Sequence, residues 1–161
     1  MMGYAYREDA TRKDMTEDGW LRTGDLADID NEGYHRIVGR EKDLIITAGG
    51  ENVPPVLIED SIIEELPCLS NAMLIGDRRK FLSCLLTLKV EVDADTLEPT
   101  DKLASAAVDW CKEIGSKAKT VDEAINDPAV TKAIQSSMDR VNGNATSNAQ
   151  VKCKVNVQTD Q

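Results

Sequence analysis

The chain has 161 residues, of which 29 are acidic and 19 basic, so its formal net charge is −10. Hydrophobic residues make up 41% and aromatic residues only 4%, which predicts a folded protein with an aliphatic core rather than a disordered one. The acidic balance argues against nucleic acid or an anionic membrane as the main partner, and no apolar run approaches the ~18 residues of a membrane span.

The first third of the chain is expected to form turns and short strands. Asn31–Gly33 is a turn signal, so the segment that follows it, Tyr34–Val38, is predicted to be the return arm of a hairpin. A buried strand is predicted at Asp43–Thr47, because Leu, Ile and Ile stand at its centre. This strand runs into a loop, Ala48–Asn52, that contains two adjacent glycines.

The middle of the chain predicts a helix followed by a hairpin. The helix is expected to begin at Pro54-Pro55, because proline is tolerated in the first helical turn, and to end at Pro67. Its apolar stripe consists of Ile58, Ile62, Ile63 and Leu66. Two strands, Ala72–Ile75 and Phe81–Val90, then flank a basic turn at Gly76–Lys80, which predicts an antiparallel hairpin.

The last third is predicted to be mainly helical after a polar stretch, Glu91–Asp101. The first apolar stripe consists of Leu103, Ala106, Ala107, Trp110 and Ile114. Thr120 and Glu123 form a capping box, and a further helix is expected from Asp127-Pro128 until Gly143 stops it. The apolar face of that helix consists of Val130, Ala133, Ile134, Met138 and Val141. A loop is expected at 144–150 and a weak strand at 151–157. The predicted fold class is α+β: a small mixed or antiparallel sheet with packed helices, preceded by a short β-hairpin segment.

Metal and nucleophile chemistry is limited by the few residues that could support it. The four cysteines, Cys68, Cys84, Cys111 and Cys153, include no Cys-x-x-Cys pair, and His35 is the only histidine. A zinc site, a Ser-His-Asp triad or a Cys-His pair would depend on that one residue. We therefore expect no metal site, and we expect reduced thiols in a cytoplasmic protein, with Cys84 in a core strand.

One candidate binding residue is Asp25, which follows a glycine at the end of Arg22–Asp25. A single carboxylate can accept hydrogen bonds from both hydroxyls of a vicinal diol, and such charge-assisted bonds are stronger than neutral ones. Asp25 can therefore hold a ribose. The alternative interpretation is an ordinary surface turn.

Two further segments have both a functional and a structural interpretation. Gly39–Asp43 links two predicted strands, so it is either a charged connection or a hinge, and Arg40 in it can donate to a ribose or phosphate oxygen. Thr47–Pro55 is either a tight strand-to-helix turn or a glycine loop that a ligand approaches closely. Its spacing matches neither the dinucleotide-binding nor the phosphate-loop pattern.

The order of these segments resembles the adenylate-forming acyl-CoA synthetases. The motifs that carry the resemblance are Arg22-Thr23-Gly24-Asp25, Asp30 with Gly33-Tyr34, Gly39-Arg40-Glu41-Lys42-Asp43, and Ile45 to Pro55. The "bubblegum" long-chain fatty-acid–CoA ligase branch is indicated by Glu51-Asn52-Val53-Pro54-Pro55 and by Leu74 to Ser83. The resemblance covers essentially the whole chain.

This resemblance implies a reaction in two steps. A fatty acid and ATP, with Mg²⁺, form an acyl-adenylate and pyrophosphate, and the thiol of coenzyme A then displaces AMP. It further implies that Asp25 and Arg40 bind ATP and AMP, and that Lys42 is the hinge on which the small domain rotates between the steps. The loop Gly49, Gly50 and Glu51 would line the coenzyme A channel. Arg79 belongs either to a solvated hairpin tip or to a site for the 3′-phosphate of coenzyme A.

The resemblance also implies that the chain is a fragment. Residues 1–41 would be the end of a large nucleotide-binding domain, and residues 42–161 a small C-terminal domain truncated before its end. The family's catalytic lysine would lie beyond Gln161, so we expect no catalytic residue within the chain, no activity from it alone, and no tight binding of ATP or coenzyme A. Fatty acid, ATP and coenzyme A would be partners of the complete enzyme, and the missing large domain a partner of the fragment.

The complete enzyme would be cytoplasmic, or peripheral on the endoplasmic reticulum or other membranes. The alternative to the enzymatic hypothesis is a non-catalytic acidic module that acts through protein contacts. That alternative is supported by the charge of −10 and by the lack of a complete catalytic set.

Overall fold

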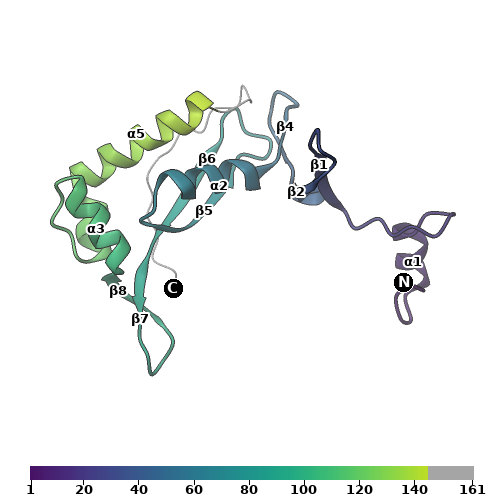
Figure 1. Cartoon of the computed structure of the whole chain (residues 1–161), viewed down its shortest axis with the longest axis horizontal. Coiled ribbons are helices and arrows are strands. Elements are labelled where there is room, and N and C mark those ends of the chain that lie inside the picture. Colours follow the sequence, from purple (N-terminus) through teal and green to yellow (C-terminus); the bar gives the residue numbers. More distant parts are fainter. Residues whose placement is uncertain (145–161) are drawn as a thin grey trace. The chain divides into compact units, whose positions relative to one another are not determined.

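We obtained a computed structural model of the chain, which describes residues 1–144 (Figure 1). The chain divides into two compact units, one comprising Met1–Leu44 and the other beginning at Ile45. Across the described residues, the strands pair antiparallel in four two-stranded sheets, and five α-helices accompany them. The α+β prediction is confirmed, although separate two-stranded ladders replace the single small sheet that was expected.

The first unit begins with a helix that the sequence pattern did not predict, α1 (Glu8–Asp14). It has no buried residue, so there is no apolar stripe from which to predict it. Its charges favour a helix instead, because acidic side chains occupy the first turn and basic side chains the last, which complements the helix dipole.

The hairpin of the first unit is confirmed. It consists of β1 (Asp25–Ile29) and β2 (His35–Arg40), paired in register from Asp25↔Arg40 to Ile29↔His35, with a register shift after Leu26. Asp30 organises the turn, since its Oδ1 accepts hydrogen bonds from the backbone N–H groups of Glu32 and Tyr34, both at 2.9 Å.

The buried strand expected at Asp43–Thr47 is much shorter in the structure. Asp43 belongs to a 3₁₀ turn, η1 (Glu41–Asp43), and only β3 (Ile45–Ile46) is extended. Ile45 is buried, but Ile46 is 50% exposed. β3 pairs with β4 (Asn52–Val53), a strand that the sequence did not predict because it lies in an apparent loop.

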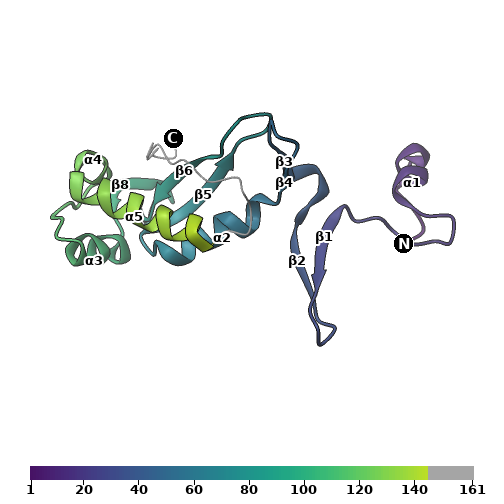
Figure 2. The ribbon, with the colours of Figure 1, turned by 90° about the horizontal axis from the view of Figure 1, so that it is seen from above.

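The helix predicted after the two prolines is confirmed as α2 (Pro55–Glu65), and Pro55 occupies its first turn. Ile62 and Leu66 are fully buried beneath it. Burial of an aliphatic side chain of this size contributes about 1.5–3 kcal/mol. α2 packs against β5 (Leu69–Ile75) and lies alongside α5 (Pro128–Asn144), where the Glu65 carboxylate pairs with Arg140 (Figure 2).

The predicted hairpin with the basic tip is confirmed, with changed bounds. β5 begins three residues earlier than expected, and it pairs antiparallel with β6 (Ser83–Leu88). The expected long strand Phe81–Val90 is interrupted at Lys89, whose Nζ donates to Pro67 O at 2.9 Å and whose backbone N–H donates to Cys68 O at 2.8 Å.

No strand was predicted in the polar stretch Glu91–Asp101, but the structure has strands there. β7 (Val90–Val92) pairs with β8 (Pro99–Leu103) to form a further hairpin. Leu103 therefore belongs to a strand and not to the helical stripe. This hairpin has few apolar residues, so its strands carry no strong alternation signal.

Three helices complete the second unit: α3 (Ser105–Glu113), α4 (Val121–Asn126) and α5. α3 buries Ala107, Trp110 and Cys111, whereas Ala106 is exposed, contrary to the predicted stripe. Thr120 caps α4, and its Oγ1 accepts from Glu123 N at 3.3 Å.

The second half of the capping box and the helix end differ slightly from the prediction. In a capping box the carboxylate of Glu123 would accept from Thr120 N. In the structure it accepts from the preceding residue, Lys119 N, at 2.8 Å. α5 passes through Gly143 and ends at Asn144. The loop and strand predicted at 144–150 and 151–157 lie outside the described residues, apart from Asn144.

One aliphatic cluster forms the core of the second unit. It draws on every helix and on the inner face of the β5–β6 hairpin, and its fully buried larger members include Ile62, Leu66, Leu69, Leu82, Leu86, Ile134 and Met138. Cys68, Cys84 and Cys111 are buried within it, and Cys84 lies in β6 as predicted. Burial raises the pKa of Cys68 to about 12, and burial also raises that of Cys111, so both remain protonated at neutral pH.

The two units should differ in their resistance to local unfolding. The first unit contributes no residue to the buried core and exposes Trp20, Ile29, Tyr34 and Ile37. Few buried apolar contacts mean low local stability. We expect backbone amides in β1 and β2 to exchange with deuterium roughly a hundredfold faster than those in β5 and β6. Equal protection of the two hairpins in hydrogen-exchange mass spectrometry would contradict this expectation.

A second prediction concerns Gly76, at the start of the turn between β5 and β6. A Cβ at this buried position would overlap Leu82 Cδ2 and lie 3.3 Å from Leu82 Cα. Since Leu82 is fully buried, Gly76→Ala should lower the free energy of unfolding by about 1–3 kcal/mol. Gly143→Ala is the matched control, because no atom of the described residues lies within 4 Å of its added Cβ, and it should not destabilise. Equal urea midpoints for both variants and the wild type would contradict the prediction.

Candidate functional site

Asp25 and Arg40 face each other across the open end of the first hairpin. They are register partners on β1 and β2, and Arg40 Nε lies 3.2 Å from Asp25 Oδ1. The chain closes this end with a hydrogen bond from Glu41 N to Gly24 O at 2.8 Å. Gly24 adopts φ +77°, a conformation that favours glycine, and β1 begins at the next residue, Asp25.

This pair combines an anionic acceptor with a cation at the surface. The side chain of Asp25 is 30% exposed and that of Arg40 is 69% exposed, so solvent or a ligand can reach both. A carboxylate accepts hydrogen bonds from hydroxyls, and a guanidinium donates to phosphate or hydroxyl oxygens. The two residues predicted from sequence as nucleotide contacts are therefore brought together, with the chemistry that such contacts need.

Lys42 is the central residue of η1, and it is exposed. It belongs to the first unit and lies two residues before that unit ends at Leu44. Neither an ion pair nor a side-chain hydrogen bond of Lys42 occurs among the described residues.

The glycine loop, residues 47–51, is the turn of the β3–β4 hairpin. Thr47 closes it in two ways: its backbone N–H donates to Glu51 O at 3.0 Å, and its Oγ1 accepts from Glu51 N at 3.2 Å. Gly50 N donates to Thr47 O at 2.9 Å, and Gly50 adopts φ +79°. Gly49 and Gly50 are exposed and have no side chains, so a ligand can approach their backbone closely.

The basic turn, residues 76–80, lies against the edge of β3 that β4 leaves open. Arg78 N donates to Ile46 O at 2.7 Å, and Ala48 N donates to Arg79 O at 2.9 Å. Asp77 Oδ1 accepts from Ile46 N at 3.2 Å. The structure thus brings the glycine loop and the basic turn side by side, although they are about thirty residues apart in sequence.

Sequence reasoning missed two residues of this arrangement, Thr47 and Asp77. Thr47 has a local signal, because a threonine beside a Gly-Gly turn commonly bonds to backbone groups a few residues away. Asp77 has none, since its backbone partner is 31 residues away. Only the paired strands reveal that contact.

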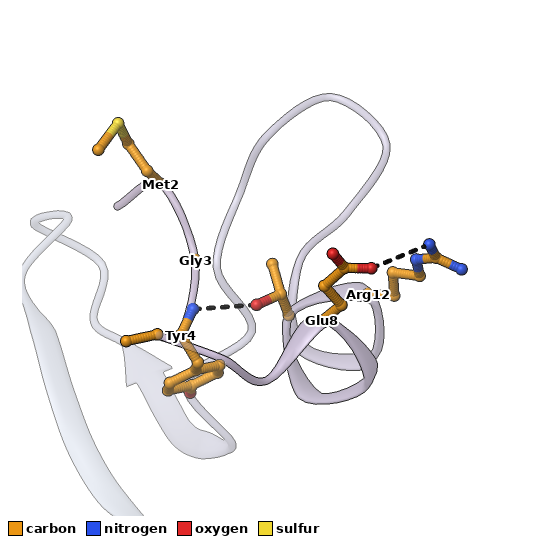
Figure 3. A pocket seen from close by; sticks show the side chains of 7 residues that line it. Met2, Gly3, Tyr4, Glu8 and Arg12 are labelled. Carbon is orange, nitrogen blue, oxygen red and sulfur yellow. Dashed lines mark hydrogen bonds and ion pairs between the residues drawn. The ribbon is translucent and has the colours of Figure 1, made fainter.

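The N-terminal segment of the first unit forms a shallow hollow with the first turns of α1 (Figure 3). Tyr4 N donates to Thr11 Oγ1 at 2.9 Å, and Glu8 pairs with Arg12 at 3.5 Å. The hollow contains none of the residues predicted to be functional. Within residues 1–144, no cluster of metal-ligating side chains occurs, and no helix is long and apolar enough to cross a membrane.

Comparison with known proteins gives a family match for part of the chain. Residues 42–121 match the family described as "AMP-binding enzyme C-terminal domain". The long-chain-fatty-acid–CoA ligase ACSBG2 of Xenopus laevis is 53% identical over 151 residues, which are 92% of this chain and 20% of that protein. The long-chain-fatty-acid–CoA ligase ACSBG1 of Bos taurus is 56% identical over 146 residues, which are 89% of this chain and 20% of that protein. The chain thus spans about a fifth of these relatives.

Solved structures with a similar fold include adenylation domains. That of a carboxylate reductase from Mycobacterium chelonae superposes with a TM-score of 0.64 at 20% identity, covering 99% of this chain and 21% of that one. The A domain of a carboxylic acid reductase from Segniliparus rugosus, in complex with AMP and a co-purified carboxylic acid, gives 0.60 at 18% identity, covering 98% and 21%. At these identities the likeness shows a shared fold.

Proposed function

The chain belongs to the AMP-binding enzymes, the adenylate-forming family that the sequence resembles, and from this membership we propose that it forms the C-terminal part of a long-chain-fatty-acid–CoA ligase. The observation that carries the proposal is identity of 53–56% to ligases of that name over about nine-tenths of the chain. The complete protein would join a fatty acid to ATP and then transfer the acyl group to coenzyme A. The acidic-module alternative is not favoured, because the matched relatives are ligases.

Asp25 and Arg40 would serve the first step. In this proposal the Asp25 carboxylate accepts hydrogen bonds from the ribose hydroxyls of ATP, and Arg40 holds that carboxylate in place while it donates to ribose or phosphate oxygens. The 3.2 Å ion pair between them supports this division of roles. Mg²⁺ would enter with the triphosphate as part of the substrate.

Lys42 and the glycine loop would serve the change between the two steps. A hinge needs a short segment that can absorb changes in φ and ψ, and the exposed η1 turn at the boundary of the units has that character. In the thioester-forming state, Gly49, Gly50 and Glu51 would line the channel for the pantetheine arm. Arg79, whose backbone carbonyl accepts from Ala48 N, would lie beside that channel and bind a phosphate of coenzyme A.

The assignment of Asp25 is tested by Asp25→Asn in the complete ligase. Loss of a charge-assisted bond to the ribose costs about 1.5–3 kcal/mol, so the KM for ATP in fatty-acid-dependent pyrophosphate exchange should rise roughly tenfold or more. Asp28→Asn is the control, because Asp28 is exposed on the same strand and its carboxylate accepts from the backbone N–H of the neighbouring Ile29. An unchanged KM for ATP in Asp25→Asn would exclude Asp25 as a nucleotide contact.

The hinge is tested by comparing Lys42→Pro with Lys42→Ala in the complete ligase. Proline fixes φ near −65°, whereas alanine removes the charge and keeps the backbone free. We expect Lys42→Pro to slow thioester formation at least about tenfold, with pyrophosphate exchange unchanged, and Lys42→Ala to remain close to wild type in both. Wild-type thioester formation by Lys42→Pro would show that no rotation occurs about this residue.

A further inference from the structure

β3 carries a hydrogen-bonded neighbour on each of its two edges. On one edge it pairs with β4, and on the other it meets the basic turn. Three hydrogen bonds form this second contact: Arg78 N to Ile46 O at 2.7 Å, Ala48 N to Arg79 O at 2.9 Å, and Ile46 N to Asp77 Oδ1 at 3.2 Å. The glycine loop is therefore fixed by its own hairpin and by the basic turn.

One of these three bonds depends on a side chain. The bonds of Arg78 and Ala48 join backbone groups, so they do not depend on the identity of either residue. The bond to Ile46 N requires an acceptor at position 77, and the carboxylate of Asp77 supplies it. The residue at position 77 therefore determines whether this third hydrogen bond between the basic turn and β3 can form.

Asp77 also acts on the turn itself. Its second oxygen, Oδ2, lies 3.7 Å from Arg78 Nε, so one carboxylate contacts both β3 and the neighbouring guanidinium. Arg78 adopts φ +56°, an unfavourable conformation for a residue with a side chain. A residue in this conformation needs restraint from its surroundings, and the hydrogen bond from Arg78 N to Ile46 O supplies it.

We infer that Asp77 is a positioning residue for the coenzyme A-dependent step: it holds the basic turn against β3 and so fixes the glycine loop and Arg79 relative to each other. The inference rests on the proposed function, because it concerns the step that the loop would serve. Asp77 would not touch the reacting atoms. Its contribution would be to keep the loop backbone and the guanidinium of Arg79 in one arrangement before coenzyme A arrives.

The test uses the complete ligase with Asp77→Ala and Asp77→Asn. Alanine removes the acceptor, whereas asparagine keeps an oxygen that can accept from Ile46 N. We expect Asp77→Ala to raise the KM for coenzyme A about fivefold or more while pyrophosphate exchange stays within about twofold of wild type. Asp77→Asn should recover most of the wild-type KM.

A control separates positioning from general stability. Asp93 organises the turn between β7 and β8 by accepting from Asp95 N at 2.9 Å and Thr96 N at 3.0 Å, and this turn lies at the far end of the unit from β3 and β4 (Figure 1). Asp93→Ala should therefore destabilise its own turn and leave the KM for coenzyme A unchanged. An Asp93→Ala variant that raised this KM as much as Asp77→Ala would assign the effect to general destabilisation and overturn the inference.

A structural readout makes the inference testable even without turnover. In Asp77→Ala, deuterium uptake by the segment 46–52 should increase, and in Asp77→Asn it should remain close to wild type. Unchanged uptake in Asp77→Ala, or an unchanged KM for coenzyme A, would overturn the inference. If Asp25→Asn alters ATP-dependent exchange while Asp77→Ala changes nothing, the positioning role fails and the proposed function stands. If Asp25→Asn leaves the KM for ATP unchanged while Asp77→Ala increases deuterium uptake, the assignment of Asp25 fails, and Asp77 is still shown to hold the basic turn against β3.

Discussion

The burial of aliphatic side chains on one face of the β5–β6 hairpin is the constraint on which the second unit depends. The inward residues Leu74, Cys84 and Leu86 are buried in the cluster, and α2 packs against β5. A two-stranded hairpin is at best marginally stable by itself, so the helices are what make it persist. Because Trp110 is the one aromatic side chain among the described core residues, close packing of aliphatic side chains has to supply the stability.

That core also determines where the candidate site can form. Gly76, the first residue after β5, is buried against Leu82. The core therefore fixes the point at which the basic turn begins. The turn then supplies hydrogen bonds to β3, a strand of only two residues that could not persist alone. The order of dependence runs from the packed hairpin to its turn, from the turn to β3, and from β3 to the glycine loop.

The sequence predicts those elements of the molecule that bury an apolar face, because burial leaves a periodic hydrophobic pattern. α2 was predictable because Ile58, Ile62 and Leu66 recur at helical spacing between prolines. α1 and the β7–β8 hairpin bury little apolar surface, so no periodicity marks them. For the site, the Asp25–Arg40 pair was predictable as two chemically suited residues beside a predicted hairpin. The bond from Ile46 N to Asp77 was not, because it joins a turn and a strand 31 residues apart.

The two units hold their proposed site residues in place by different interactions. Asp25 and Arg40 lie on a hairpin whose unit contributes nothing to the buried core, so their geometry depends on the strand pairing and on one exposed ion pair. An exposed ion pair of this kind contributes about 0–1 kcal/mol, too little to hold a nucleotide site in one geometry by itself. The glycine loop, by contrast, is connected through β3 and the basic turn to a packed core. In the proposed ligase, the remaining chain would have to stabilise Asp25 and Arg40, whereas the glycine loop already has its support within this chain.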